Sequence, residues 1–274
     1  MKNQYFGDFG DYQKFSLLKH LRDLSSFKII VHWMKTKDDS SNDGSKIKYL
    51  SNANEWSIFE PEIFDFLTKH LALNTRDLSL YEKSHHARDI NFLSEYIENE
   101  DIRQKLLEGI RHANSDLVFF DPDNGIEVKS TNSKNRHKYV TWTDIKTAFD
   151  SGKSVLIYQH YSRMNRDKFI AQKLIEFNDR FKEEIFVIKV KHSVYFLMPQ
   201  EKHKTPISNA LKGYSSLWKD TAVVKNHPSI SPQRLAELRR TTLIASAGAS
   251  TRLEGSKLSD KEVEQVANTV FGQK

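Results

Sequence analysis

Polar residues suited to chemistry follow three short apolar runs of the sequence. After residues 116–120 come Asp121, Pro122, Asp123 and Asn124. After residues 154–159 comes His160, with Arg163 nearby, and the polar loop after residues 28–34 holds Asp38, Asp39, Asp43 and Gly44. In an open α/β sheet, ligands bind beyond the carboxyl ends of the strands. If the three runs are strands of one sheet, these groups are expected to line one crevice.

Asp121 is the strongest catalytic candidate. An acid placed directly after four apolar residues is costly to bury unless something pairs with it. The alternative is an Asp-Pro turn in which Asp121 and Asn124 bond their own backbone. His160 also has two interpretations. It can belong to the site, or it can be a core histidine among aromatic residues whose hydrogen bonds are satisfied within the protein. No metal site is predicted at His85 and His86, since neighbouring helical positions do not face the same way.

The spacing of apolar residues predicts strands that alternate with helices. Strands are expected over 28–34, 116–120, 154–159, 184–190 and 193–198, and helices over 11–24, 60–73, 88–109, 143–150 and 165–182. This alternation favours the α/β class, with a Rossmann-like, mostly parallel sheet covered on both faces and a C-terminal antiparallel hairpin. The expected organisation is an α/β domain over 1–212, a linker over 213–230 and a short all-helical tail over 231–274.

Composition narrows the class of protein. The chain has 274 residues and no cysteine, which excludes disulfides and thiolate metal sites and suits a reducing cytoplasm. No apolar stretch approaches the roughly 18 residues needed to cross a bilayer, so a cytoplasmic protein without membrane contact is expected. The net charge of +6 permits nucleic-acid binding without establishing it.

Two motifs carry a resemblance to known proteins. The first runs from Tyr5-Phe6-Gly7-Asp8 through Gly10-Asp11-Tyr12-Gln13-Lys14-Phe15 to Leu17-Leu18-Lys19-His20, and the second is Phe119-Phe120-Asp121-Pro122-Asp123-Asn124-Gly125. Together they resemble a family of uncharacterised bacterial proteins. More remotely, they are similar to the ribosomal-RNA adenine methyltransferases of the RlmJ kind, which open with a comparable helix and place Asp-Pro-Pro-Tyr after an apolar strand.

The methyltransferase resemblance implies a function and a cofactor. It implies that S-adenosylmethionine binds at a Rossmann-like sheet, near Asp8 and Lys14 of the opening motif and near Asp39, Asp43 and Gly44 of the first loop. Asp121 and Pro122 match the family's motif, in which the Asp accepts from the amine being methylated. Asp123 stands where the second proline would be, and Asn124 replaces the stacking aromatic. A glycine-rich turn is expected after the first strand, and only Asp43-Gly44 corresponds to it in this sequence.

A metal-dependent nuclease is a competing interpretation. Asp123 with Glu127, Val128 and Lys129 superficially resembles the PD-(D/E)xK pattern, although the spacing is too short for acids from separate strands. Carboxylates and waters alone can hold Mg²⁺. The nuclease hypothesis therefore stays open with Mg²⁺ as its cofactor.

The tail carries a separate motif. Ser250-Thr251-Arg252-Leu253-Glu254-Gly255 is similar to the inhibitory motif [S/T]-x-x-x-E-[G/N] of Fic-type AMP transferases, and flanking residues 235–240 and 258–263 extend the similarity. In that family the glutamate pairs with an arginine that otherwise holds a phosphate of ATP. The resemblance implies partner contacts by Ser250, Arg252, Glu254 and Gly255. The alternative is an ordinary amphipathic helix pair with chance similarity.

The Fic catalytic loop, His-x-Phe-x-x-Gly-Asn-Gly-Arg, does not occur in the sequence. The chain is therefore not expected to be an AMP transferase itself. Two function hypotheses follow, and they are compatible on one chain. One is a methyltransferase-like enzyme that acts on nucleic acid, and the other is an antitoxin-like regulator of a separate Fic protein in trans.

Overall fold

The computed structural model describes residues 1–40, 44–218 and 220–226. The chain divides into two compact units. The first comprises Met1–Tyr161 and Glu184–Lys225, and the second comprises Ser162–Glu183 and Asn226–Lys274. The predicted tail over 231–274 lies outside the described residues, as does Asp43, so the expectations for Ser250, Arg252, Glu254 and Gly255 stay predictions.

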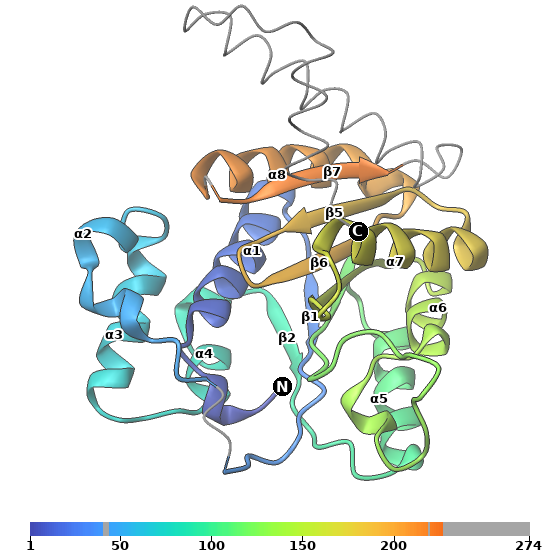
Figure 1. Ribbon diagram of the computed structural model, residues 1–274, viewed down its shortest axis with the longest axis horizontal. Helices are drawn as coiled ribbons and strands as arrows, with labels where there is room; N and C mark the ends of the chain where they lie inside the picture. The colour runs from blue at the N-terminus through green and yellow to red at the C-terminus, as the bar shows by residue number, and fades with distance from the viewer. Residues whose placement is uncertain (41–43, 219, 227–274) are drawn as a thin grey trace, which may run out of the picture. The chain divides into compact units, whose positions relative to one another are not determined.

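The described chain alternates helices and strands (Figure 1). The strands are β1 (Ile29–His32), β2 (Ile90–Leu93), β3 (Leu117–Phe120), β4 (Ser154–His160), β5 (Ile185–Lys189), β6 (Ser193–Met198) and β7 (Ala222–Asn226). The helices of the first unit are α1 (Phe9–Ser25), α2 (Ala53–Trp56), α3 (Pro61–Ala72), α4 (Leu78–Glu82), α5 (Glu100–His112), α6 (Trp142–Asp150) and α8 (Lys204–Leu217). The second unit holds α7 (Arg166–Phe181), whose N-cap Asn165 accepts from the backbone of Asp167 and Lys168.

The strands form one sheet in the order β2-β1-β3-β4-β6-β5-β7. β2, β1, β3 and β4 run parallel, whereas β6 is antiparallel to both β4 and β5. The predicted α/β class is confirmed, with a mostly parallel core and antiparallel C-terminal strands. None of the described helices is long and apolar enough to span a membrane.

Alternation along the strands divides the core between the two faces of the sheet. Val31, Phe119 and Leu156 belong to one cluster with the apolar residues of α1 and α8. Their strand neighbours Val118 and Ile157 are equally buried and point to the other face, because successive side chains alternate. Figure 1 shows α1 and α8 side by side, and α5 and α6 together apart from α2, α3 and α4.

The described part of the predicted linker is regular structure. Residues 213–217 complete α8, and β7 follows after a turn. The Tyr214 hydroxyl donates to the carbonyl of Gln13, and the Trp218 indole donates to the Ser16 hydroxyl. These bonds attach the segment to α1 and explain why it is not an extended connection.

β2 replaces the first part of the helix expected over 88–109. The helix itself, α5, begins after Asn99, whose side chain accepts from the backbone N–H of Ile102. An N-cap fixes where a helix starts, because its side chain satisfies an amide that has no partner within the helix. The four residues of β2 then pair with β1 in parallel.

Candidate functional site

The strand order places a potential ligand site between β1 and β3. From β1 the chain continues to β2 on one side, and from β3 to β4 on the other side. A crevice opens beyond the carboxyl ends of the strands at such a switch point. The backbone N–H of Asp121 donates to the carbonyl of His32 at 3.0 Å, which continues the pairing of the two strands. The strand pairing thus places Asp121 at this point.

Lys14 of α1 joins two buried carboxylates. Its Nζ lies 2.7 Å from Oδ2 of Asp121 and 3.0 Å from Oδ1 of Asp11. All three side chains are at most 5% exposed. Burial alone lowers the pKa of Lys14, but the charges of Asp11 and Asp121 outweigh it and raise that pKa well above the ordinary value. Lys14 therefore stays an ammonium ion.

Asp11 carries the excess negative charge of this cluster. Its Oδ2 is buried, and no described residue donates a hydrogen bond to it. Burial raises the pKa of Asp11 to about 7, Lys14 opposes that rise, and nearby Asp8 adds to it. Asp8 is the N-cap of α1 and accepts from the backbone N–H of Asp11 at 2.9 Å. Burial raises the pKa of Asp8 as well.

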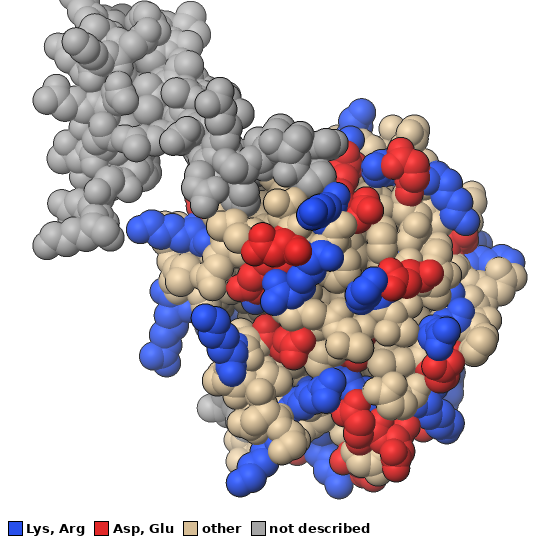
Figure 2. All heavy atoms as spheres, turned by 90° about the vertical axis from the view of Figure 1, so that its right-hand side faces the viewer, with Lys and Arg blue, Asp and Glu red and all other residues tan. Residues whose placement is uncertain are grey.

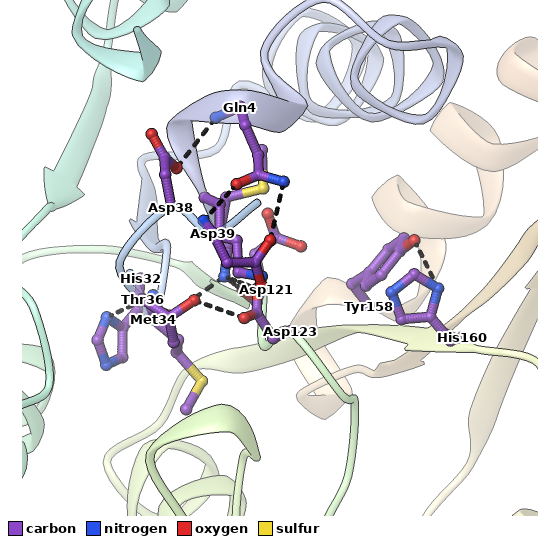
Figure 3. Close-up of polar contacts among 12 residues, drawn as sticks. Gln4, His32, Met34, Thr36, Asp38, Asp39, Asp121, Asp123, Tyr158 and His160 are labelled. Atoms are coloured by element: carbon purple, nitrogen blue, oxygen red, sulfur yellow. Dashed lines mark hydrogen bonds and ion pairs between the residues drawn. The ribbon is translucent and has the colours of Figure 1, made fainter. Parts of the chain in front are cut away.

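Asp123 lies beside Asp121 but pairs with different groups (Figure 3). Its carboxylate lies 2.8 Å from the amino group of Met1 and accepts a hydrogen bond from the Thr36 hydroxyl. Burial would raise the pKa of Asp123, yet these two partners lower it below the ordinary value. The Met1 amino group also donates to the carbonyl oxygens of Met34 and Asp121.

Tyr158 and His160 lie at the end of β4, across from Asp121 and Asp123 (Figure 3). The Tyr158 hydroxyl lies 3.2 Å from Nδ1 of His160. The Lys14 Nζ lies 5.2 Å from the centre of the Tyr158 ring, within range of a cation–π contact. His160 is exposed at one edge, yet enough protein surrounds it that desolvation lowers its pKa. Burial raises the pKa of Tyr158, so its hydroxyl stays protonated.

Gly125 shapes the loop that carries these acids. Its φ is +83°, a left-handed conformation that favours glycine, and an added Cβ would lie 2.3 Å from the Gln159 side chain. Gln159 in turn accepts from the backbone N–H of Ile126 at 2.8 Å. The close approach of loop and strand requires glycine at this position.

A cleft of about 470 Å³ opens between these elements, within the roughly 300–1,000 Å³ of small-molecule sites. It brings together most of the residues predicted from the sequence. These are Asp8, Lys14, Gly44, Asp121, Pro122, Asp123, Asn124 and His160. Four carboxylates line it, those of Asp8, Asp11, Asp121 and Asp123, and two cations offset part of their charge, because Lys14 pairs with Asp11 and Asp121 and the Met1 amino group pairs with Asp123.

Residues of the first loop contact the N-terminal segment more than the cleft. Asp39 pairs with Lys2, and Asp39 and Gln4 exchange two hydrogen bonds (Figure 3). Asp39 is not among the residues that line the cleft. Gly44 has φ +81°, and its carbonyl accepts from Arg76. The loop is thus held by structural contacts at both of these residues.

Sequence reasoning missed Asp11 and Tyr158. A signal for Asp11 was present, because residues three apart on a helix share a face and Lys14 was already singled out. Tyr158 lies two residues before His160 on the same strand, and such residues point to the same side.

No family model matches this chain, and no curated protein matches it. Among solved structures, a protein from Legionella pneumophila assigned to the family model DUF519 is similar, with a TM-score of 0.43. The two sequences are 12% identical, and the match covers 81% of this chain and 97% of the other.

Proposed function

We propose that the chain transfers a methyl group from S-adenosylmethionine to an amino nitrogen of a nucleic-acid base. Asp121 would accept a hydrogen bond from the amine that is methylated. The observation that carries the proposal is the buried Asp121 carboxylate at the end of β3, held by Lys14 at the switch point of the sheet.

The cleft fits this cofactor by charge. S-adenosylmethionine supplies a methyl group on a positively charged sulfur and also carries an ammonium and a carboxylate. The unpartnered Oδ2 of Asp11 suits the ammonium, because a buried acceptor without a donor is costly. Lys46, which also lines the cleft, suits the carboxylate, since the Lys14 ammonium is already bonded to Met1, Asp11 and Asp121. Lys46 is exposed and can move toward a ligand.

The chain's own residues have distinct roles in this proposal. Lys14 donates to Oδ2 of Asp121 at 2.7 Å and so holds the carboxylate in one orientation. An acceptor fixed in this way orients an amine so that its lone pair points at the methyl donor. Orientation of this kind contributes much to catalysis, because the reactants lose their translational and rotational entropy on binding, before the reaction.

A groove beside the cleft supports a nucleic-acid substrate. It has a volume of about 590 Å³ and shares Ser45 and Lys46 with the cleft. The groove is lined by the aromatic residues Phe9, Tyr49, Trp56 and His192 and by the basic residues Lys46, Lys48 and Lys191. Aromatic faces stack on bases and lysines attract phosphates, which is the combination found in single-strand binding sites.

Another face of the surface gives a contrast. On the face in Figure 2, Lys and Arg alternate with Asp and Glu. By comparison, Lys46, Lys48 and Lys191 form no ion pair with an acid that the structure describes, and all three are exposed. Unpaired lysines beside aromatic residues attract phosphate more effectively than paired ones.

Calorimetry with S-adenosylmethionine tests the cofactor, and radiolabelled methyl transfer to single-stranded RNA and DNA tests the reaction. Asp121→Asn should bind the cofactor and lose transfer by about a hundredfold or more, the effect of losing one oriented hydrogen-bond partner in an active site. Asp116→Asn is the matched control at the other end of β3, where Asp116 accepts from the backbone of Lys28.

A wild-type protein that binds no S-adenosylmethionine would refute the proposal. Mg²⁺-dependent cleavage of nucleic acid that is lost in Asp121→Ala would then favour the nuclease. The contacts of the acids do not favour it, because Glu127 accepts from the backbone of Trp142 at the start of α6. Asp123 is already paired with Met1 and Thr36.

The tail supports a separate hypothesis, inhibition of a Fic protein in trans by Glu254. It rests on the sequence motif alone, since these residues lie outside the described part of the chain. The test mixes this protein with a Fic AMP transferase that lacks its own inhibitory segment. Glu254→Gly should lose suppression, because a hydrogen bond to a charged group is worth about 1.5–3 kcal/mol. Equal suppression by both forms, or none by either, would refute the hypothesis.

A further inference from the structure

Three potential metal ligands meet away from the cleft, near the start of α3. Glu62 lies in the first turn of α3, and His85 and His86 form a 3₁₀ turn over His85–Ala87. One ligand atom from each residue lies within 4.8 Å of the other two. The two imidazole rings are 3.8 Å apart between centroids, so the expectation that adjacent histidines face apart does not hold here.

The backbone around His86 is firmly held. Arg22 of α1 donates to the carbonyl of His86, and the His86 ring packs edge-on against Phe66 with centroids 5.1 Å apart. The residue is 4% exposed, and its Nδ1 is buried without a hydrogen bond from any described residue. The His86 imidazole thus has a ring nitrogen that no described residue occupies, although most buried polar atoms have a partner.

We propose that Glu62, His85 and His86 bind a divalent transition-metal ion, with Zn²⁺ as the preferred occupant. Two imidazoles and one carboxylate are a ligand set that Zn²⁺ accepts, with a fourth tetrahedral position left for water. Imidazole ligands favour Zn²⁺, Co²⁺ and Ni²⁺ over Mg²⁺ and Ca²⁺, which prefer oxygen. Glu62 and His85 are exposed, so an ion can enter from solvent.

The surrounding charges permit such a site. Lys19 lies 3.9 Å from the Glu62 carboxylate, but its closer partner is Glu60 at 2.9 Å. A bound ion would link the start of α3 to the turn that leads into β2, and would therefore stabilise the first unit.

The test uses the full chain and the metals alone. Zn²⁺ is titrated by calorimetry, and Co²⁺ is titrated by its visible absorption, which reports tetrahedral coordination. One ion per chain is expected, with a rise in melting temperature because the ion binds the folded state. Glu62→Gln and His85→Asn change exposed residues, so they should leave the fold intact. Each should weaken binding by more than the roughly 10–100-fold lost when a residue that only orients a metal ligand is changed.

Glu108→Gln with His112→Asn is the matched control. Glu108 and His112 form an exposed carboxylate–imidazole pair, 3.3 Å apart on α5, with no third ligand among the described residues. Removing this pair should leave the titration unchanged. His86→Ala should abolish binding, and its circular dichroism spectrum will show whether it folds. No saturable binding by the wild type, or equal binding by the Glu62 and His85 variants, would overturn the proposal.

Discussion

Two buried clusters of paired charges in the first unit differ in how completely their charges are satisfied. Arg103 of α5 bonds both oxygens of Asp144, and two further N–H groups donate to the carbonyls of Arg136 and Tyr139. Asp144 also accepts from the backbone of Thr141, in a capping box at the start of α6. One cation meets one anion, and the backbone takes up the rest.

The Lys14 cluster is equally buried but unevenly balanced. One ammonium meets the carboxylates of Asp11 and Asp121, and one oxygen of Asp11 has no donor among the described residues. A structural ion pair has its hydrogen bonds completed within the protein, whereas a binding site keeps capacity for a ligand. Both clusters are buried, so burial does not distinguish them. They differ in how many of their polar atoms have a hydrogen-bond partner.

The largest stability effect is expected at the satisfied pair. Arg103→Met leaves Asp144 buried without its partner, which should cost about 3–5 kcal/mol in the free energy of unfolding. Urea denaturation measures this loss. Arg111→Met on the same helix removes an exposed arginine and should change stability by no more than about 0.5 kcal/mol. A small effect of Arg103→Met would mean that the pair does not hold α5 to α6.

The Lys14 cluster should instead affect how the free energy of unfolding depends on pH. Because the folded pKa of Asp11 is about 7 and its ordinary value is 3.8, the folded state retains a proton that the unfolded state releases between these values. Stability contributed by this proton is present below about pH 4 and falls as the pH rises to about 7. Asp11→Asn should remove this slope and make the protein more stable at pH 8, by roughly 1–4 kcal/mol.

The matched comparison for this profile is Asp144→Asn. Its carboxylate has complete hydrogen bonds, so the variant should be destabilised at pH 8 rather than stabilised. Unfolding followed from pH 4 to pH 8 gives both curves. Parallel curves for wild type and Asp11→Asn would show that Asp11 is ionised across the whole range and that burial does not raise its pKa.

Much of the sheet could be predicted from the sequence, because its central strands are apolar runs. All residues of β1 and β3 are buried and all but His32 are apolar, and β4 contains the apolar run of residues 155–158. β2 was missed because its four residues are too few to show whether their periodicity is that of a strand or of a helix. The N-cap Asn99 marked the real helix start, since acidic residues follow it in the first turn.

The C-terminal part of the first unit was harder to predict. Pro206 and Gly213 fall within α8, and both indicate a break when read alone. Proline is tolerated in a first turn, and a glycine inside a helix costs only about 1 kcal/mol. Burial of Tyr214 and Trp218 against α1 outweighs that cost, and long-range packing of this kind has no local signal.

The candidate site could be predicted in part. Asp121 was recognisable as an acid after apolar residues, and Lys14 by resemblance. Their 2.7 Å contact joins residues 107 positions apart, and only the fold shows it. Asp39 was expected in the crevice because its loop follows β1, yet it bonds the N-terminal segment instead. A loop residue's direction depends on partners that spacing does not reveal.

The smallest effect, and the sharpest comparison, concerns two glycines with the same left-handed backbone conformation. Gly125 and Gly152 have φ of +83° and +82°, but an added Cβ meets the Gln159 side chain only at Gly125 and no atom within 4 Å at Gly152. Gly152→Ala should therefore cost about 1 kcal/mol from the conformation alone, and Gly125→Ala up to about 3 kcal/mol.

Displacement of Gln159 would also release its bond to Ile126 and shift the loop of Asp121. Gly125→Ala should thus weaken ligand binding in the cleft, whereas Gly152→Ala should not. Urea unfolding and calorimetry of both variants decide the matter, because equal losses of stability with unchanged binding would mean that the loop geometry does not hold the acids in place.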